Sequence, residues 1–265
     1  MKKIIALVLA VAMIASVAML AGCGNSNSKQ SGSDSKGGKL TMATNATFPP
    51  YEYKEGEEYV GIDVEIAKAI ADKLGMELEI ADIEFDSIIT GVQTGKYDMG
   101  MAGMSVTDER KQSVDFSDSY ATGIQAVIVK EGSEIKTADD LLAQGTSYKV
   151  GVQLSTTGDM YIGDDYEKAG KDASLITRFQ SGNDAVTALA SGKVDAVVID
   201  NEPAKSYVAS TKGLQILDSK YAEEDYAICF AKNNTELKDK VNAALKELIA
   251  DGTVKGIIDK YIKAN

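Results

Sequence analysis

Residues 105–110, SVTDER, have the types and order that suit recognition of a carboxylate. Thr107 can cap a helix, and Asp108 and Glu109 then fall in its first turn, where negative charge complements the helix dipole. Arg110 follows at the third helical position, against that preference, which is tolerable if its guanidinium binds a carboxylate through two hydrogen bonds. The sequence leaves two partners open for Arg110. A neighbouring acidic side chain is the simpler choice, and a bound anion is the other.

Asp200 is a second charged residue with candidate chemistry, because it ends the apolar run 196–199. In open α/β sheets, ligands bind beyond the carboxyl ends of the strands, and a carboxylate at such an end suits an ammonium group. The alternative role of Asp200 is to cap a helix that begins before Glu202 and Pro203.

Aromatic residues stand at a similar position near the start of the chain. Phe48 comes directly after the first expected strand, and Pro49 and Pro50 force an extended turn there. Together with Tyr51 and Phe85, Phe48 can form an apolar wall for a ligand, although aromatic side chains more often pack in a core.

Alternating strands and helices must position these side chains. In the helix pattern 61–75, Asp63 is the expected N-cap and Gly75 the expected stop. The alternation predicts an α/β protein. Strand patterns cover residues 40–45, 76–80, 97–103, 147–153 and 194–200, and further helix patterns cover residues 87–95, 184–192 and 235–252.

The segment IITGVQTGKYDMGMA, residues 88–102, resembles AVTALASGKVDAVVI, residues 185–199. Gly95 aligns with Gly192 and Asp98 with Asp195. Helix, glycine and strand in succession are a common arrangement, so the likeness alone leaves two explanations open: chance use of that arrangement, or two similarly built lobes.

The first residues form a separate segment. Residues 1–22 join two lysines to an apolar run, the pattern of a signal peptide, with a membrane-spanning helix as the alternative. The small residues before Cys23 resemble a bacterial lipobox, which implies that Cys23 is lipidated and anchors the protein to the outer face of the cell membrane. Residues 23–38 then form a flexible tether, because positions 24–38 contain no apolar residue.

Composition excludes several kinds of site. The chain has 28 Lys+Arg against 40 Asp+Glu, a formal charge of −12, so nucleic acid is not an expected partner. Its 2 cysteines are Cys23 and Cys229, and it has 0 histidines, which excludes histidine-based catalytic triads and argues against a zinc site. We expect Cys229 to be a buried free thiol, and we expect neither a metal nor a cofactor.

From about residue 39 to residue 262 the chain resembles the extracytoplasmic solute-binding proteins (family 3) of polar amino-acid ABC transporters. The resemblance implies an α/β, two-lobe periplasmic-binding-protein-like fold with two hinge strands and a ligand cleft between the lobes. Residues 39–124 and 220–265 would form lobe 1, and residues 125–219 lobe 2. The segments that carry the resemblance are MATNATFPPYEY, GIDVEIAKAIADKLG, TGKYDMGMAGMSVTDERKQSVDFSDSY, KVGVQLSTTG and GKVDAVVID.

The resemblance also implies roles for particular residues. Arg110 would bind the α-carboxylate of one amino acid, helped by Ser105 and by the backbone of Gly103 and Ser105, and Asp200 would accept hydrogen bonds from its α-ammonium group. The remaining contacts would come from Asn45, Phe48, Phe85, Gln153, Thr156 and Thr157. Ser155 stands where the family usually has glycine, in the turn that contains Gln153 to Thr157.

The function implied is that of a monomeric receptor that delivers an amino acid to an ABC permease, and not of an enzyme. Relatives that bind basic amino acids carry an acid at the position of Asn45, so its neutrality favours an uncharged polar ligand such as glutamine, or cystine, over a basic one. Two alternatives share the fold. A cyclohexadienyl-acid dehydratase would need a general acid, for which Glu52 and Asp86 are candidates, and a ligand sensor would need a membrane segment after the domain.

Overall fold

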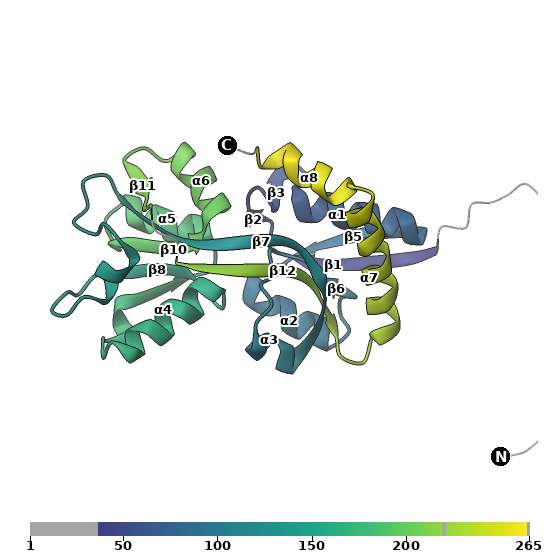
Figure 1. Ribbon diagram of the computed structural model, residues 1–265, viewed down its shortest axis with the longest axis horizontal. Coiled ribbons are helices and arrows are strands. Elements are labelled where there is room, and N and C mark those ends of the chain that lie inside the picture. Colours follow the sequence, from purple (N-terminus) through teal and green to yellow (C-terminus); the bar gives the residue numbers. More distant parts are fainter. Residues whose placement is uncertain (1–36, 219–220, 264–265) are drawn as a thin grey trace, which may run out of the picture. The chain divides into compact units, whose positions relative to one another are not determined.

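A nine-stranded mixed sheet runs through the part of the chain that the computed structural model describes, residues 37–218 and 221–263 (Figure 1). The sheet order is β5 (Met76–Asp82), β1 (Gly37–Thr44), β6 (Met99–Gly100), β12 (Ala222–Ala231), β7 (Val114–Lys130), β10 (Ala196–Asp200), β8 (Val150–Gln153) and β9 (Ile176–Phe179), while β11 (Leu214–Ile216) pairs with β7. A second sheet contains β2 (Thr47–Phe48), β3 (Glu52–Glu55) and β4 (Glu58–Val60).

Two long antiparallel strands, β7 and β12, join the two lobes of this fold (Figure 1). The first lobe contains β1–β6 and the helices α1 (Ile62–Leu74), α2 (Phe85–Gln93), α3 (Asp108–Ser113), α7 (Thr235–Ala250) and α8 (Thr253–Tyr261). The second lobe contains β8–β11 and the helices α4 (Thr157–Lys168), α5 (Gly182–Ala190) and α6 (Asn201–Ser210). The predicted two-lobe α/β architecture with two hinge strands is confirmed.

The sequence also predicted where the lobes and the tether begin and end. The boundary between residues 124 and 125 falls inside β7, which both lobes share, so this assignment stays a prediction. The signal peptide, Cys23 and most of the tether lie outside the described residues. Gly37 and Gly38, expected at the end of the tether, are instead the first residues of β1.

Helix α1 shows how the sequence pattern positions the site. Its isoleucines at one-turn spacing are fully buried, and it ends at Gly75 in the left-handed conformation, with φ 66°. The expected capping role of Asp63 was wrong, because Gly61 occupies the N-cap position. Asp63 lies one residue inside the helix, where its Oδ2 accepts hydrogen bonds of 2.8 Å from the Gly103 N–H and from the Tyr120 hydroxyl.

The internal likeness corresponds to equivalent structure in the two lobes. The Asp98 carboxylate accepts a hydrogen bond of 2.7 Å from the N–H of Thr41 in β1. The Asp195 carboxylate accepts one of 2.8 Å from the N–H of Lys149, directly before β8. In each lobe the glycine after the helix has a positive φ, 71° at Gly95 and 75° at Gly192. The aspartate after each glycine therefore links two parallel strands by a hydrogen bond, β6 with β1 in one lobe and β10 with β8 in the other. The two lobes are similarly built here.

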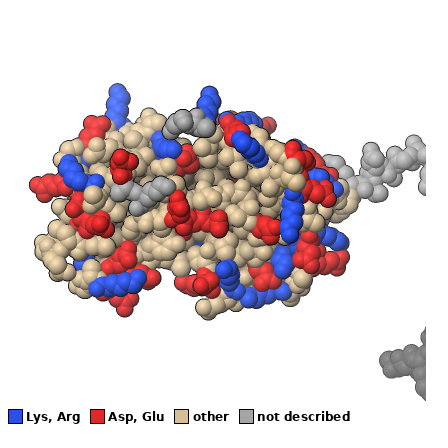
Figure 2. Space-filling view, viewed as in Figure 1, with Lys and Arg blue, Asp and Glu red and all other residues tan. Residues whose placement is uncertain are grey.

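Acidic and basic side chains are interspersed on the face of residues 37–263 that Figure 2 shows, and no extended basic patch appears on it. Several of the ion pairs among the described residues join two exposed side chains, such as Lys39 with Glu79 at 2.7 Å. Such pairs contribute little to stability. Among the described residues, no helix is long and apolar enough to cross a membrane.

Candidate functional site

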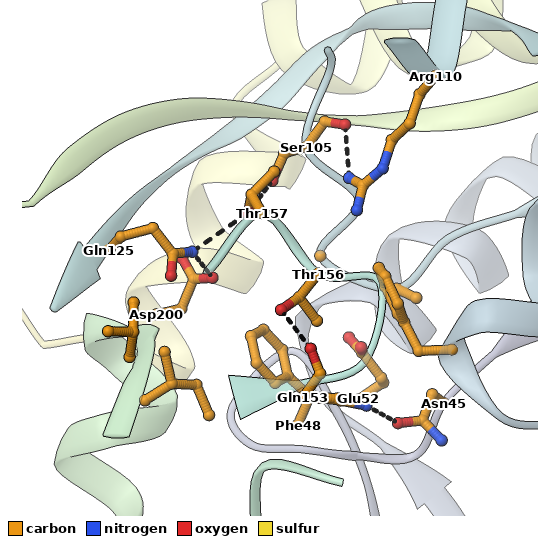
Figure 3. Close-up of a pocket in the computed structure, with 15 residues that line it drawn as sticks. Asn45, Phe48, Glu52, Ser105, Arg110, Gln125, Gln153, Thr156, Thr157 and Asp200 are labelled. Carbon is orange, nitrogen blue, oxygen red and sulfur yellow. Dashed lines mark hydrogen bonds between the residues drawn. The ribbon is translucent and has the colours of Figure 1, made fainter. Parts of the chain in front are cut away.

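A cavity between the two lobes contains all ten residues that the sequence analysis assigned to a ligand site. It encloses about 430 Å³ of space free of atoms, its opening to solvent included. Figure 3 shows how the side chains lie around it. The lining residues are Asn45, Phe48, Glu52, Phe85, Ala102, Gly103, Ser105, Arg110, Gln125, Gln153, Thr156, Thr157, Val198, Ile199 and Asp200.

Arg110 enters this cavity as a buried guanidinium without an acidic partner. Thr107 caps α3 as predicted, because its hydroxyl accepts a hydrogen bond of 3.1 Å from the Arg110 N–H. The guanidinium donates to the carbonyl of Ser105 at 2.8 Å and to the carbonyl of Ser155 at 3.0 Å. Only 5% of the residue is exposed, and no carboxylate of a described residue lies within ion-pair distance. The neighbouring-acid alternative is therefore wrong, and a buried positive charge faces the cavity.

Asp200 lies on another wall of the cavity, at the carboxyl end of β10 (Figure 3). It occupies the N-cap position of α6, but its side chain makes no capping hydrogen bond. Instead it accepts from Gln125 Nε2 at 2.6 Å and from the Tyr226 hydroxyl. Burial raises the pKa of the Asp200 carboxyl to about 7; the hydrogen bond from Tyr226 opposes this shift and the charge of Glu224 adds to it. A ligand cation here would stabilise the ionised form.

Glu224 of β12 adds a second buried carboxylate next to Asp200. Its Oε2 accepts from the Thr157 hydroxyl at 2.9 Å and from Gln125 Nε2 at 3.0 Å, while its Oε1 has no hydrogen-bond partner. Gln125 thus bridges the two acids. The Arg110 wall and the Asp200 wall consequently carry opposite charge, which suits the two ends of a zwitterion.

Gly103 and Ser105 of the first lobe are engaged within the protein. The Gly103 N–H, which the resemblance assigned to a ligand carboxylate, donates to Asp63. The Ser105 carbonyl accepts from Arg110, and its hydroxyl lies 3.4 Å from the hydroxyl of Thr157 across the cavity. Ser105 and Gly103 therefore position Arg110 and α1 as well as lining the cavity.

The amino-terminal end of α4 supplies the facing residues of the second lobe. Thr156 is the N-cap of this helix, and its hydroxyl donates to the Gln153 carbonyl at 2.8 Å. Thr157 is the first helical residue, so its hydroxyl points toward Ser105 and Glu224. Ser155 adopts φ 62°, the conformation that favours glycine, and its carbonyl reaches Arg110.

Asn45, Gln153 and Glu52 lie together at a third part of the cavity (Figure 3). Gln153 Nε2 donates to Asn45 Oδ1 at 2.9 Å, and Asn45 Nδ2 donates to the carbonyl of Ile83 at 2.9 Å. Asn45 is therefore occupied by protein partners. Glu52 on β3 is only 1% exposed and is the acidic side chain of this region.

The aromatic residues divide between the cavity and the core. Phe48 lines the cavity, and the Phe85 ring lies 5.4 Å from the guanidinium carbon of Arg110, a cation–π arrangement. Tyr51 does not line the cavity, contrary to expectation. It is buried between Phe48 and Tyr226, with ring centroids 6.0 Å and 5.2 Å away.

Sequence reasoning missed Gln125 and Glu224 and gave Glu52 only a catalytic alternative. A signal existed for Gln125, since it is a lone polar residue between Ile124 and Ala126 in an apolar strand. Glu224 stands in an acidic run and carries no such signal. Asp86, the other suggested general acid, is exposed and does not line the cavity. Among the described residues, no group of three potential ligands could hold a metal ion.

Gly123 keeps the Asp200 wall intact, because a Cβ there would lie 2.3 Å from the Tyr226 hydroxyl oxygen and 2.6 Å from Asp200 Oδ1. We expect Gly123→Ala to weaken ligand binding at least about tenfold and to lower the free energy of unfolding by about 1–3 kcal/mol, the range for overpacked sites. Titration calorimetry and urea unfolding measure both effects. Gly256→Ala is the control, since a Cβ there meets no atom within 4 Å. Unchanged binding in Gly123→Ala would show that this wall tolerates displacement.

Comparison with known proteins relates this cavity to a family. Residues 40–264 match the model of the bacterial extracellular solute-binding proteins, family 3. The arginine-binding extracellular protein ArtP of Bacillus subtilis (strain 168) is 39% identical over 250 residues, which cover 91% of this chain and 92% of ArtP. The ABC transporter glutamine-binding protein GlnH of the same strain is 32% identical over 278 residues, covering 99% and 98%.

Solved structures agree in fold. An ancestral arginine-binding protein bound to arginine is 40% identical, with a TM-score of 0.79, covering 86% of this chain and 99% of that one. The structure of an ancestral arginine-binding protein bound to glutamine is also 40% identical, with a TM-score of 0.78, covering 85% and 98%. The chain therefore belongs to the bacterial extracellular solute-binding proteins of family 3. It is a binding protein and not an enzyme.

Proposed function

We propose that this protein is an extracytoplasmic receptor that binds one polar amino acid between its lobes and delivers it to an ABC permease. The observation that carries the proposal is the buried, acid-free guanidinium of Arg110 opposite the buried carboxylate of Asp200. A buried charge without a partner is costly, and an amino acid supplies both counter-charges at once. The names of ArtP and GlnH support this ligand class.

The charges suggest how the ligand lies. Arg110 and the hydroxyls of Ser105 and Thr157 bind the α-carboxylate, while Asp200 and Glu224 accept hydrogen bonds from the α-ammonium group. The ligand side chain then extends along Phe48 toward Glu52. Because Arg110 and Asp200 belong to different lobes, a bound amino acid favours the closed arrangement over an open one. We retain residues 39–124, 125–219 and 220–265 as the lobe segments of this motion.

We place arginine first among the candidate ligands. The expectation of an uncharged ligand rested on the neutrality of Asn45, but Asn45 is hydrogen-bonded to protein groups and Glu52 is the acid near the ligand's side-chain end. The relatives also do not favour an uncharged ligand over a basic one, since ArtP, named for arginine, is 39% identical and GlnH, named for glutamine, is 32% identical. Glutamine is the second candidate, because proteins of the same family are described as binding it.

The family and the predicted lipidation of Cys23 suggest where the receptor is located. The family is extracellular, and we propose that cleavage before Cys23 and lipidation of that residue hold the protein at the outer face of the cell membrane. Residues 24–36 would give it room to meet a permease. Labelling with a radioactive fatty acid in cells, compared with Cys23→Ala, tests the anchor. Equal labelling of both proteins would contradict it.

A thermal-shift panel tests the proposed ligand class. The purified protein, unfolded and refolded to remove any carried-over ligand, is heated with each of the twenty amino acids, cystine and ornithine. A ligand that binds only the native state stabilises by about 4 kcal/mol at a thousandfold excess over Kd. We expect the largest shift with arginine and a smaller one with glutamine. No shift with any amino acid would overturn the proposed function.

A further inference from the structure

Glu52 is a buried acid that forms no ion pair with any described residue. It lines the cavity, yet it is 1% exposed and its Oε2 has no N–H or O–H donor. The titratable groups that interact electrostatically with it are Asp63 on α1, Asp200 at the end of β10, Tyr207 on α6, and the phenols of Tyr51 and Tyr120. All of these are acids or phenols. Arg110 lines the same cavity but binds the carbonyls of Ser105 and Ser155, so no described residue forms an ion pair that compensates an ionised Glu52.

Glu52 and Asp63 are both buried, and they are close enough for the charge of Asp63 to raise the pKa of the Glu52 carboxyl. Asp63 Oδ2 already accepts from Gly103 and Tyr120, whereas Asp63 Oδ1, like Glu52 Oε2, has no donor from any other described residue. Two neighbouring buried carboxyl groups do not both ionise readily, so one of them keeps its proton. Asp63 has two donors that stabilise its charge and Glu52 has none, so the proton resides on Glu52.

The electrostatics agree with this assignment. Burial raises the pKa of the Glu52 carboxyl well above its ordinary value, and the charge of Asp63 raises it further. Burial raises the pKa of Asp63 only to about 6, because the hydrogen bonds from Gly103 and Tyr120 oppose the shift. Asp63 therefore ionises more readily than Glu52, and the two acids titrate as a coupled pair.

We propose that Glu52 and Asp63 share one proton at the ligand's side-chain end of the cavity, and that a cationic side chain displaces this proton whereas an uncharged one leaves it in place. Protons and charges balance in this exchange. The neutral Glu52 carboxyl and a ligand guanidinium become a carboxylate–guanidinium pair, and one proton passes to the solvent. An amide side chain carries no charge that requires a carboxylate partner, so Glu52 stays neutral and no proton is lost.

This proton exchange rests on the proposed function and makes it more specific. It allows one cavity to present a neutral carboxyl group to glutamine and a negative charge to arginine. It also predicts that rising pH tightens arginine binding more than glutamine binding, because arginine must remove a proton from Glu52 and glutamine need not. Asp200 contributes equally in both cases, since the two ligands have the same α-ammonium group.

Titration calorimetry of the full chain counts the protons. Arginine and glutamine are each titrated at pH 7 in buffers of different ionisation enthalpy, which gives the protons released per ligand bound. We expect arginine to release about one proton more than glutamine, the number that the Glu52–Asp63 pair holds. Binding of both ligands with equal proton release would overturn the proposal. So would failure of arginine and lysine to bind anywhere between pH 6 and pH 9 while glutamine binds.

Glu52→Gln keeps the shape and the donor of the neutral acid. We expect it to weaken arginine binding at least about a hundredfold more than glutamine binding, and to release equal numbers of protons with both ligands. Glu55→Gln, on the exposed end of the same strand, is the matched control and is expected to retain the difference. Retention of the extra proton in Glu52→Gln would overturn the proposal.

A measurement without ligand separates this proposal from the proposed function. Infrared spectra of the free protein at pH 8, where Asp200 is mostly ionised, are compared with those of Glu52→Gln. We expect the carbonyl band of a protonated carboxyl group in the first protein and its loss in the second. Absence of that band at pH 8 would overturn the shared proton even if amino acids bind. Failure of all amino acids to bind, with the band present, would reject only the receptor function.

Discussion

Arg110→Ala is expected to weaken amino-acid binding by about 3–5 kcal/mol, roughly a hundredfold to several thousandfold in Kd. The guanidinium is buried, has no acidic partner among the described residues, and donates only to the carbonyls of Ser105 and Ser155. Without it, the ligand carboxylate would be taken out of water with no counter-charge. Titration calorimetry with arginine and glutamine measures the loss, which we expect to be similar for both because they share the α-carboxylate.

The chain offers a matched control for this substitution, because Arg110 and Arg178 are its two arginines. Arg178 pairs with Asp159 at 2.8 Å, is partly exposed and does not line the cavity. We expect Arg178→Ala to change Kd by less than about threefold, as is usual for surface charges. Arg110→Lys should recover part of the affinity, since lysine restores the charge without the planar fork. Normal binding by Arg110→Ala would assign Arg110 to folding alone.

The fold was largely predictable because its elements are coded locally. The isoleucines of α1 repeat at one-turn spacing, and Gly75 and Thr107 occupy the cap positions that their chemistry favours. The likeness between residues 88–102 and 185–199 was a genuine structural signal, since Asp98 and Asp195 make the same strand-to-strand hydrogen bond. Asp63 was misplaced because a capping pattern cannot reveal a tertiary acceptor. Its partners Gly103 and Tyr120 are distant in the sequence.

The sequence predicted only those site residues that belong to a recognisable motif. Arg110, Asp200 and the α4 threonines stand at element ends, where a family resemblance can be read residue by residue. Glu224 and Gln125 meet Asp200 only through the pairing of β12, β7 and β10, and no local pattern encodes that contact. The error over Asn45 has the same origin. Its neutrality was visible in the sequence, whereas its two protein partners and the nearby Glu52 were not.

Asp200→Asn is expected to have the second large effect on binding, a loss of about 2–5 kcal/mol for arginine and glutamine alike. Asparagine preserves the shape, its amide oxygen can accept from Gln125, and its NH2 group can donate to the Tyr226 hydroxyl oxygen, so folding should change little. The loss arises because the α-ammonium group would lie in a buried site with Glu224 as its remaining acid. Glu202→Gln is the control. Glu202 is on the same helix and pairs with Lys205 at 2.7 Å, outside the cavity.

The pH dependence of glutamine binding is an independent test of the role of Asp200. Burial raises the pKa of Asp200 to about 7, so the free protein holds a proton there at lower pH. An ammonium ligand requires the carboxylate, and binding must therefore expel that proton as pH falls below about 7. We expect the Kd for glutamine to rise about tenfold between pH 8 and pH 6, and the Kd of Asp200→Asn to stay nearly constant. Glutamine is the proper ligand because it leaves the Glu52 proton in place. A pH profile that the substitution does not flatten would place the titrating acid elsewhere, and Glu224→Gln would then be the variant to compare.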